Sequence, residues 1–387
     1  MIRFVLLAAV AVLGLAGSAM AEPIAATPAE QVQLDALYQP EDWFVSHLKG
    51  PRETANGAIL DARLQYVLET VTRPASAPAV QAYLRSSYAT AQGRDAARTA
   101  LDRYWALRTL ETAAMQTVSD DMVTGRAGDG IAVRIYQPKS TEKRLPVLVY
   151  YHGGGFMFGS IEGWDRAMRL IANEGRVIVV SVAYRLAPEH PYPAAWNDAE
   201  DAYDWTLSHI RAFGGDARAV AVGGDSAGGT LAISVALRAA KAKKTGPSAL
   251  LLYYPGVDRE GVYPSMKTFG TGYGLDADAL AYLAGLVYPA GSATTSADTS
   301  PMQADLCPMP QSLIVTAGFD PLSGSQLAFA ARLKDKGCPV EVRTYGTLIH
   351  AFLQTTGYVP DAAAAATETA RRFGEMVRHP AKGRTCK

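Results

Sequence analysis

The chain has 387 residues, with 37 basic and 37 acidic side chains and a hydrophobic content of 49%. This length and composition suit one large folded domain or two small ones and exclude broad disorder. The charges are balanced, and no basic stripe or acidic block argues for a nucleic-acid partner.

The first 21 residues have the features of a secretory signal peptide. Arg3 gives a positive start, residues 4–15 are almost wholly apolar, and the small residues Ala19 and Ala21 suit cleavage after Ala21. An uncleaved membrane anchor is the alternative, but the apolar run is short for a span of roughly 20 residues. We therefore expect a periplasmic or secreted protein without stable membrane insertion.

Residues 22–115 favour helices. The run 60–68 has apolar residues at helical spacing, and residues 97–115 are predicted to form one helix. Several prolines divide this region into short pieces. No role follows from the sequence for residues 22–57.

From residue 116 onward, short β-rich runs alternate with helical stretches. These runs are 116–122, 131–136, 147–151, 177–182, 219–223, 250–254, 313–317 and 340–345. Continuous apolar runs suit strands that are buried on both faces. The pattern predicts an α/β fold with a mostly parallel sheet flanked by helices. Residues 259–300 interrupt it with a predicted helix at 276–288, and residues 362–377 resemble a closing helix.

The pentapeptide Gly224-Asp225-Ser226-Ala227-Gly228 lies between a predicted strand and a small-residue helix. Strand, sharp turn and helix in this order are typical of the G-x-S-x-G nucleophile elbow of an α/β-hydrolase. The alternative is an ordinary small-residue turn between a strand and a helix. On the first interpretation, Ser226 is the candidate nucleophile.

A serine nucleophile needs hydrogen-bond donors for the oxyanion that forms when it attacks. The sequence His152-Gly153-Gly154-Gly155 directly follows a predicted strand, and H-G-G-G supplies such donors in lipases and esterases. We expect the N–H groups of Gly154, Gly155 and Ala227 to form the oxyanion hole. His152 is expected to orient this loop and not to act as a base.

A serine nucleophile also needs a base and an orienting acid. Of the six histidines, only His350 follows a late strand by a short loop, residues 346–349, in the order Ser…Asp…His. Asp320 follows the predicted strand at 312–317 and is the preferred acid. Asp258 is the rival acid, on an earlier strand. His209, in a helical run, and His379, beyond the last helix, are expected to lie away from the site.

Export permits disulfides. Of the three cysteines, Cys307 and Cys338 each precede a predicted strand, and neighbouring parallel strands would begin at one edge of the sheet. We therefore predict a Cys307–Cys338 disulfide and a free Cys386. The sequence has no C-x-x-C pair and no H-E-x-x-H motif, so no metal is expected.

Four sequence blocks together carry a family resemblance. They are residues 152–155, 184–195, 224–229 and 320–322. The chain resembles the bacterial hormone-sensitive-lipase-like carboxylesterases, in their G-D-S-A-G branch, from about residue 58 to 377.

The resemblance implies an eight-stranded α/β-hydrolase domain at 116–377, with a tail at 378–387. It implies a cap over the site made from residues 22–115 and 259–300. It also implies that Ser226, Asp320 and His350 form the catalytic triad. The 184–195 block would hold loops near the site, with Glu189 and His190 in structural roles.

Two departures from the family pattern are visible. Ser323-Gly324-Ser325 replaces the usual charged residues after the acid loop, and Ala351 replaces the usual glycine after the histidine. We expect a looser acid loop with the carboxylate in place, and a small effect from Ala351.

These observations together predict an exported serine carboxylesterase that works through an acyl-enzyme, and the family resemblance implies esters of short acyl chains as its substrates. It would need no metal or organic cofactor, and its partner would be a small-molecule ester. The same triad would also serve an amidase, a lactonase or an esterase that removes acetyl or feruloyl groups from polysaccharides. A non-catalytic binding module is a further alternative, because the related plant gibberellin receptors have lost the catalytic histidine. The presence of His350 argues against this alternative.

Overall fold

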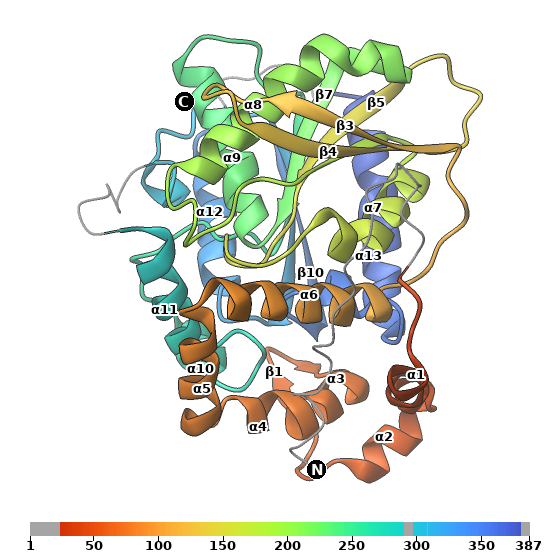
Figure 1. The fold of residues 1–387 in the computed structure, drawn as a ribbon, viewed down its shortest axis with the longest axis vertical. Helices are drawn as coiled ribbons and strands as arrows, with labels where there is room; N and C mark the ends of the chain where they lie inside the picture. The colour runs from red at the N-terminus through yellow and green to blue at the C-terminus, as the bar shows by residue number, and fades with distance from the viewer. Residues whose placement is uncertain (1–23, 290–296, 308, 381–387) are drawn as a thin grey trace.

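The computed structural model describes residues 24–289, 297–307 and 309–380. The predicted signal peptide, most of the predicted tail and Cys386 lie outside the described residues. An eight-stranded sheet forms the centre of the molecule (Figure 1). Across the sheet its strands are β10 (Val340–Ile349), β9 (Gln311–Phe319), β8 (Ala249–Tyr253), β7 (Gly215–Asp225), β5 (Leu145–Tyr151), β6 (Ile178–Val182), β4 (Gly130–Gln137) and β3 (Thr117–Thr124). Among the described strands of this sheet, β4 pairs antiparallel with β3 and with β6, and the other pairings are parallel.

Helices cover both faces of this sheet. Alternate residues of β5 belong to different hydrophobic clusters: Val147 and Val149 to one, Leu148 and Tyr150 to the other. The first cluster includes side chains of α8 (Ala194–His209), α9 (Ala227–Lys241) and α12 (Ser323–Asp335). The second includes side chains of α7 (Ile161–Gly175) and α13 (Pro360–Arg378). Because each strand residue points to the face opposite its neighbour's, a continuous apolar run is buried on both sides. The predicted fold class is confirmed.

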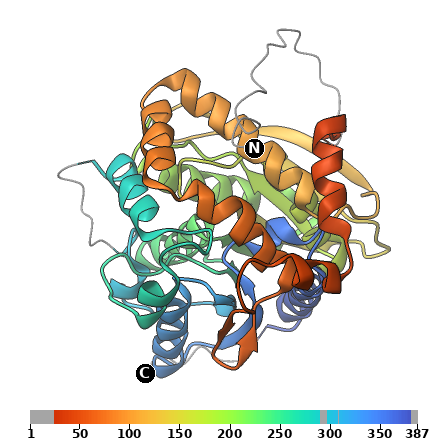
Figure 2. The same ribbon diagram turned by 90° about the horizontal axis from the view of Figure 1, so that it is seen from below.

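A layer of helices lies at one end of the sheet, as Figure 2 shows from below. The N-terminal part of this layer contains α1 (Pro28–Asp35), α2 (Glu41–His47), α3 (Ala62–Val67), α4 (Arg73–Ala75), α5 (Pro78–Tyr88), α6 (Ala91–Arg108) and the hairpin β1 (Thr54–Ala55) and β2 (Ala58–Ile59). The predicted single helix at 97–115 is wrong at its end. The Arg108 carbonyl accepts from the N–H of Gly357, and the Leu110 N–H donates to Thr356 Oγ1, so contacts with a distant segment replace further helical bonds. In the described ranges, no helix is both long and apolar enough to cross a membrane.

The segment between β8 and β9 joins the same layer through α10 (Pro264–Phe269) and α11 (Ala277–Val287). Ser76 Oγ donates to Asp276 Oδ2 over 2.6 Å, next to the start of α11. Tyr273 donates its hydroxyl to Glu53 over 2.6 Å. Two segments about 200 residues apart in sequence are therefore fastened to each other.

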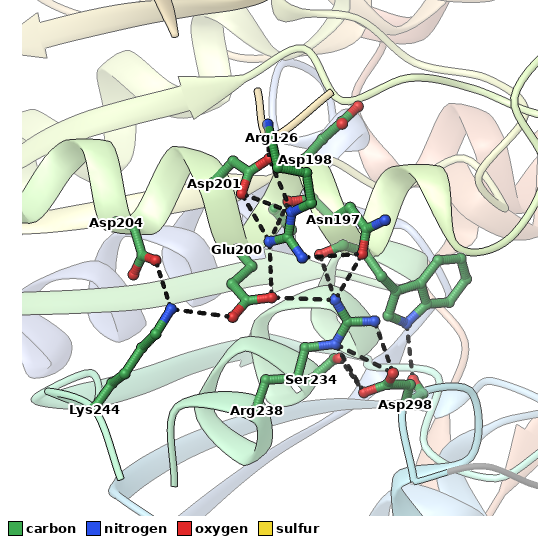
Figure 3. A network of polar contacts seen from close by, with 12 residues as sticks. Arg126, Asn197, Asp198, Glu200, Asp201, Asp204, Ser234, Arg238, Lys244 and Asp298 are labelled. Atoms are coloured by element: carbon green, nitrogen blue, oxygen red, sulfur yellow. Dashed lines mark hydrogen bonds and ion pairs between the residues drawn. The ribbon is translucent and has the colours of Figure 1, made fainter. Parts of the chain in front are cut away.

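A polar network fastens the end of this segment to α8 and α9 (Figure 3). Arg238 of α9 donates to Asp298 over 2.8 Å and to Glu200 of α8 over 3.3 Å. Ser234 donates to the same Asp298 carboxylate. Arg126, from the loop between β3 and β4, donates to Glu200 over 2.9 Å. The network connects four parts of the chain at the surface of the core.

The predicted Cys307–Cys338 disulfide is wrong. Cys338 is a free, buried thiol that packs in the cluster on the α8 and α9 face, and its Sγ donates to the Leu306 carbonyl over 3.2 Å. Cys307 is disulfide-bonded, so its partner is not Cys338. Both cysteines do precede the neighbouring strands β9 and β10, but the Cys338 side chain is directed into the core.

Candidate active site

Ser226 occupies a sharp turn between β7 and α9. Its backbone has φ 52° and ψ −117°, a conformation that non-glycine residues rarely adopt. Its N–H donates to the Tyr253 carbonyl on the neighbouring strand over 2.9 Å. A Cβ atom at Gly228 would lie 1.9 Å from the Tyr151 carbonyl oxygen, and one at Gly224 would lie 2.3 Å from Gly228. The turn therefore requires glycine at both positions, as the elbow interpretation predicted.

The structure brings Ser226, His350 and Asp320 into one hydrogen-bonded row. His350 Nε2 lies 2.9 Å from Ser226 Oγ, and His350 Nδ1 lies 3.0 Å from Asp320 Oδ2. Asp320 is fully buried, and its carboxylate also accepts from the Leu322 N–H and the Gln326 side chain. The three residues come from the carboxyl ends of β7, β10 and β9, where open α/β sheets form their sites.

His350 reaches this position in a different way from the one predicted. Residues 346–349 do not form a loop but continue β10 after an irregularity, because Tyr345 pairs with Ala317 and Ile349 pairs with Phe319. His350 therefore follows its strand directly. The irregularity places the histidine at the same level of the sheet as the residue after Phe319, which is Asp320.

The other candidates lie elsewhere. Asp258 accepts from the Tyr263 hydroxyl over 2.7 Å and from Ser300 Oγ over 3.2 Å, so it joins the two ends of the segment between β8 and β9. His209 stacks on Trp205 at the end of α8. Neither side chain is hydrogen-bonded to the row of Ser226, His350 and Asp320 in the part of the chain that the structure describes.

The glycines after β5 form a tight turn beside Ser226. Gly154 and Gly155 have φ values of 105° and 63°, and the Gly154 carbonyl accepts from the N–H groups of Met157 and Phe158. Within the described ranges, the N–H groups of Gly154, Gly155 and Ala227 donate to no other protein group. These are the three donors predicted for an oxyanion hole, and all are free to bind a substrate oxygen.

Asp225 is a residue of the site that the sequence analysis did not single out. Its Oδ1 accepts from Gly153 N–H over 3.0 Å, from Trp164 Nε1 over 2.8 Å and from the Tyr150 hydroxyl over 3.0 Å. One carboxylate thus connects the elbow to the glycine turn. Burial raises the pKa of Asp225 to about 6, although these hydrogen bonds favour its charged form. The sequence feature that could have identified Asp225 is an acidic residue at the end of an otherwise apolar strand.

His152 lies under the glycine turn. Its Nδ1 lies 2.7 Å from the Gly153 carbonyl, and its ring stacks on Tyr184 with 4.3 Å between centroids. Burial lowers the pKa of His152 to about 4, so the ring is neutral at pH 7. Because a carbonyl only accepts, Nδ1 carries the proton of the neutral ring. Tyr184, from the 184–195 block, also donates to the His152 carbonyl.

No metal site accompanies this arrangement in the described ranges, where no group of three or more His, Cys, Asp or Glu side chains is placed to hold an ion. The strand order, the strained serine turn and the row that ends at Asp320 define an α/β-hydrolase. Residues 148–354 match the family described as the alpha/beta hydrolase fold.

Comparison with known proteins identifies the family within the α/β-hydrolases. The chain is 38% identical to the esterase LipI of Mycobacterium tuberculosis over 263 residues, which are 66% of this chain and 79% of LipI. It is 32% identical to an ethyl acetate hydrolase of Pseudomonas putida over 63% of this chain and 78% of that protein. An esterase structure from Pyrobaculum calidifontis superposes with a TM-score of 0.70 at 33% identity, covering 73% of this chain and 93% of that one. The chain belongs to the hormone-sensitive-lipase-like carboxylesterases of the α/β-hydrolase superfamily and is a carboxylic ester hydrolase.

Proposed function

We propose that this chain is an exported serine carboxylesterase in which Ser226, His350 and Asp320 form the catalytic triad. The observation that carries the proposal is the row of hydrogen bonds of 2.9 Å and 3.0 Å from Ser226 Oγ through the imidazole to the buried carboxylate. Asp320 Oδ2 accepts a hydrogen bond from the Nδ1–H group of His350. This keeps the proton of the neutral ring on Nδ1 and leaves Nε2 free to take the serine proton.

The reaction proceeds through an acyl-enzyme. Ser226 Oγ attacks the ester carbonyl carbon while His350 Nε2 accepts its proton, and the N–H groups of Gly154, Gly155 and Ala227 bind the oxyanion. The tetrahedral intermediate collapses, and the alcohol leaves with the proton from His350. Water then gives its proton to His350 and attacks the acyl group, and the second collapse releases the acid and restores the serine.

Ser226→Ala tests the nucleophile. We expect kcat/KM on p-nitrophenyl acetate to fall by about 10⁴-fold or more, because no other side chain in the row can form the acyl-enzyme. A fluorophosphonate probe should label the wild-type protein at Ser226, as peptide mass spectrometry would detect. Ser208→Ala, on the exposed end of α8, is the matched control. Full activity in Ser226→Ala would refute the proposal, and an unlabelled wild type would favour a non-catalytic binding module.

The proposed substrates are esters of short acyl chains. Two observations support this preference: the similarity to a protein named for ethyl acetate, and the position of Leu283 on α11. A Cβ atom at Gly155 would lie 2.8 Å from Leu283 Cδ1, so an apolar side chain lies directly against the oxyanion turn.

A series of p-nitrophenyl esters with acyl chains of two to sixteen carbons tests the chain length. We expect kcat/KM to be highest for chains of two to six carbons, and a maximum at twelve or more would contradict the preference. Parallel assays on an aryl amide, a lactone and acetylated xylan distinguish the ester from the other bonds that this triad could cleave.

Export is proposed from the pattern of residues 1–21. Expression in a bacterial host with separation of the periplasm tests it, because cleavage after Ala21 gives a mature protein that begins at Glu22. A protein of full-length mass that stays in the cytoplasm would contradict this proposal and leave the catalytic one standing.

A further inference from the structure

The turn that carries the oxyanion donors is held from outside the sheet. We define the oxyanion loop as residues 152–159. Arg98 of α6 reaches this loop from the N-terminal helices, and its Nε donates to the Met157 carbonyl over 2.9 Å. Its Nη2 donates to the Ala187 carbonyl, also over 2.9 Å. The side chain is 17% exposed, so these bonds form in a mostly buried place.

Both carbonyls are coupled to the glycine turn. The Met157 N–H donates to the Gly154 carbonyl over 3.2 Å, so Met157 closes the turn that presents the Gly154 N–H. The Ala187 N–H donates to the Phe156 carbonyl over 2.9 Å. Arg98 therefore holds two successive residues of the oxyanion loop, Met157 directly and Phe156 through Ala187.

Glu189 fixes the direction of the Arg98 guanidinium. Its two oxygens accept from Nη2 over 2.8 Å and from Nη1 over 3.2 Å. Because the guanidinium donors lie in one rigid plane, holding two of them aims the others. Burial alone would raise the pKa of Glu189, but hydrogen bonds from Arg98 and Arg94 lower it to about 2, so the carboxylate is charged at pH 7.

Arg94, one helical turn earlier, is a natural comparison. It donates to Glu189 over 2.6 Å, and its other hydrogen bond goes to the Tyr88 carbonyl over 2.9 Å. Arg94 thus shares the helix, the charge and the carboxylate partner with Arg98. Among the described residues, Arg94 forms no hydrogen bond with the oxyanion loop.

We propose that Arg98 is a positioning residue for ester hydrolysis, holding the oxyanion loop so that the N–H groups of Gly154 and Gly155 point at the developing oxyanion. This inference rests on the proposed function. The substrate oxygen carries more negative charge in the transition state than in the bound substrate, so misaligned donors weaken transition-state binding more than substrate binding. Helix α6 then contributes to catalysis as well as covering the end of the sheet.

Arg98→Met tests this role, because it keeps an unbranched apolar stem and removes every donor. We expect kcat on p-nitrophenyl acetate to fall at least about tenfold with KM within about twofold, since losing one oxyanion donor costs about 10²–10³-fold. A trifluoromethyl ketone, which adds to the serine and forms an oxyanion, should bind more weakly by the same factor as kcat/KM falls. Arg94→Met should keep both quantities within about twofold.

Arg98→Lys gives a second measurement, since an ammonium group carries the charge but cannot reproduce the planar fork. We expect its kcat and ketone affinity to lie between those of the wild type and Arg98→Met. If Arg98→Met does not fold, as judged by circular dichroism, Arg98→Lys decides the question. The proposal would be overturned if the Arg98 variant that folds had the same kcat and the same ketone affinity as the wild type. It would also be overturned if Arg94→Met lost as much of both as the Arg98 variant does. Failure of the proposed function is a separate result, seen as wild-type protein that the fluorophosphonate does not label.

Discussion

Asp225 and His152 are both buried and both hydrogen-bonded to the backbone of Gly153, and their pKa values are shifted in opposite directions. The pKa of Asp225 is raised from 3.8 to about 6, and that of His152 is lowered from 6.5 to about 4. The folded chain binds more protons than the unfolded chain at Asp225 between pH 3.8 and 6, so this group lowers stability as pH rises. At His152 the unfolded chain binds more protons than the folded chain between pH 4 and 6.5, so this group raises the free energy of unfolding as pH rises. The two effects oppose each other in the wild-type protein.

Asp225→Asn should reveal this opposition. Asparagine keeps an acceptor oxygen and does not titrate, so the variant lacks the loss of stability that Asp225 causes as pH rises. The free energy of unfolding of the variant, relative to that of the wild type, should therefore rise by about 2–3 kcal/mol between pH 4 and pH 7.5. Urea unfolding of both proteins at these pH values measures the difference. Parallel pH profiles would contradict the raised pKa.

Asp320→Asn tests the orienting acid. Asparagine can donate to Nδ1 and so favours the tautomer that carries a proton on Nε2, which cannot accept the serine proton. We expect kcat on p-nitrophenyl acetate to fall by about 10⁴-fold with KM little changed. Asp258→Asn is the control, because this carboxylate only joins the ends of a neighbouring segment, and its kcat should fall at most several-fold. Equal losses in the two variants would contradict the assignment.

At the scale of elements, the network of Figure 3 contains one half-buried ion pair and one more exposed pair. Arg238 and Asp298 are 18% and 22% exposed, whereas Lys244 and Asp204 are 51% and 44% exposed. We expect Asp298→Ala to lower the free energy of unfolding by about 2–4 kcal/mol, because it leaves a largely buried guanidinium without its main partner. Asp204→Ala should change it by less than about 1 kcal/mol. Thermal or urea unfolding measures both, and equal effects would show that the network does not hold the segment after α11.

At the scale of the whole molecule, the N-terminal helices share a core with the sheet. Leu64 of α3 is fully buried in the same cluster as Leu148 and Leu251 of the sheet. Leu64→Ala should lower the free energy of unfolding by about 2–5 kcal/mol. We expect tryptophan fluorescence and far-ultraviolet circular dichroism to shift together, because the parts unfold as one unit.

Val32→Ala, on exposed α1, is the matched control and should change the stability by less than about 0.5 kcal/mol. An early transition seen by only one of the two probes would show instead that the helical layer unfolds by itself.

The sequence by itself determined the sheet and the residues that could meet at its edge. Apolar runs such as 147–151 predict buried strands because strand burial follows a local period of two residues. The meeting of Ser226, Asp320 and His350 could be predicted because each follows a parallel strand, and parallel strands bring their carboxyl ends together. The glycines at 224 and 228 were recognisable because their pattern reflects a local clash of backbone atoms.

Only the tertiary structure decided which distant groups hold these residues in place. The bonds from Arg98 to Met157 and from Trp164 to Asp225 cross 59 and 61 residues, and no local pattern records such partners. The end of α6 at Arg108 and the inward direction of Cys338 were mispredicted for the same reason. Helix ends and side-chain directions depend on the neighbours that the fold supplies, whereas strand periodicity and glycine turns depend on the chain itself.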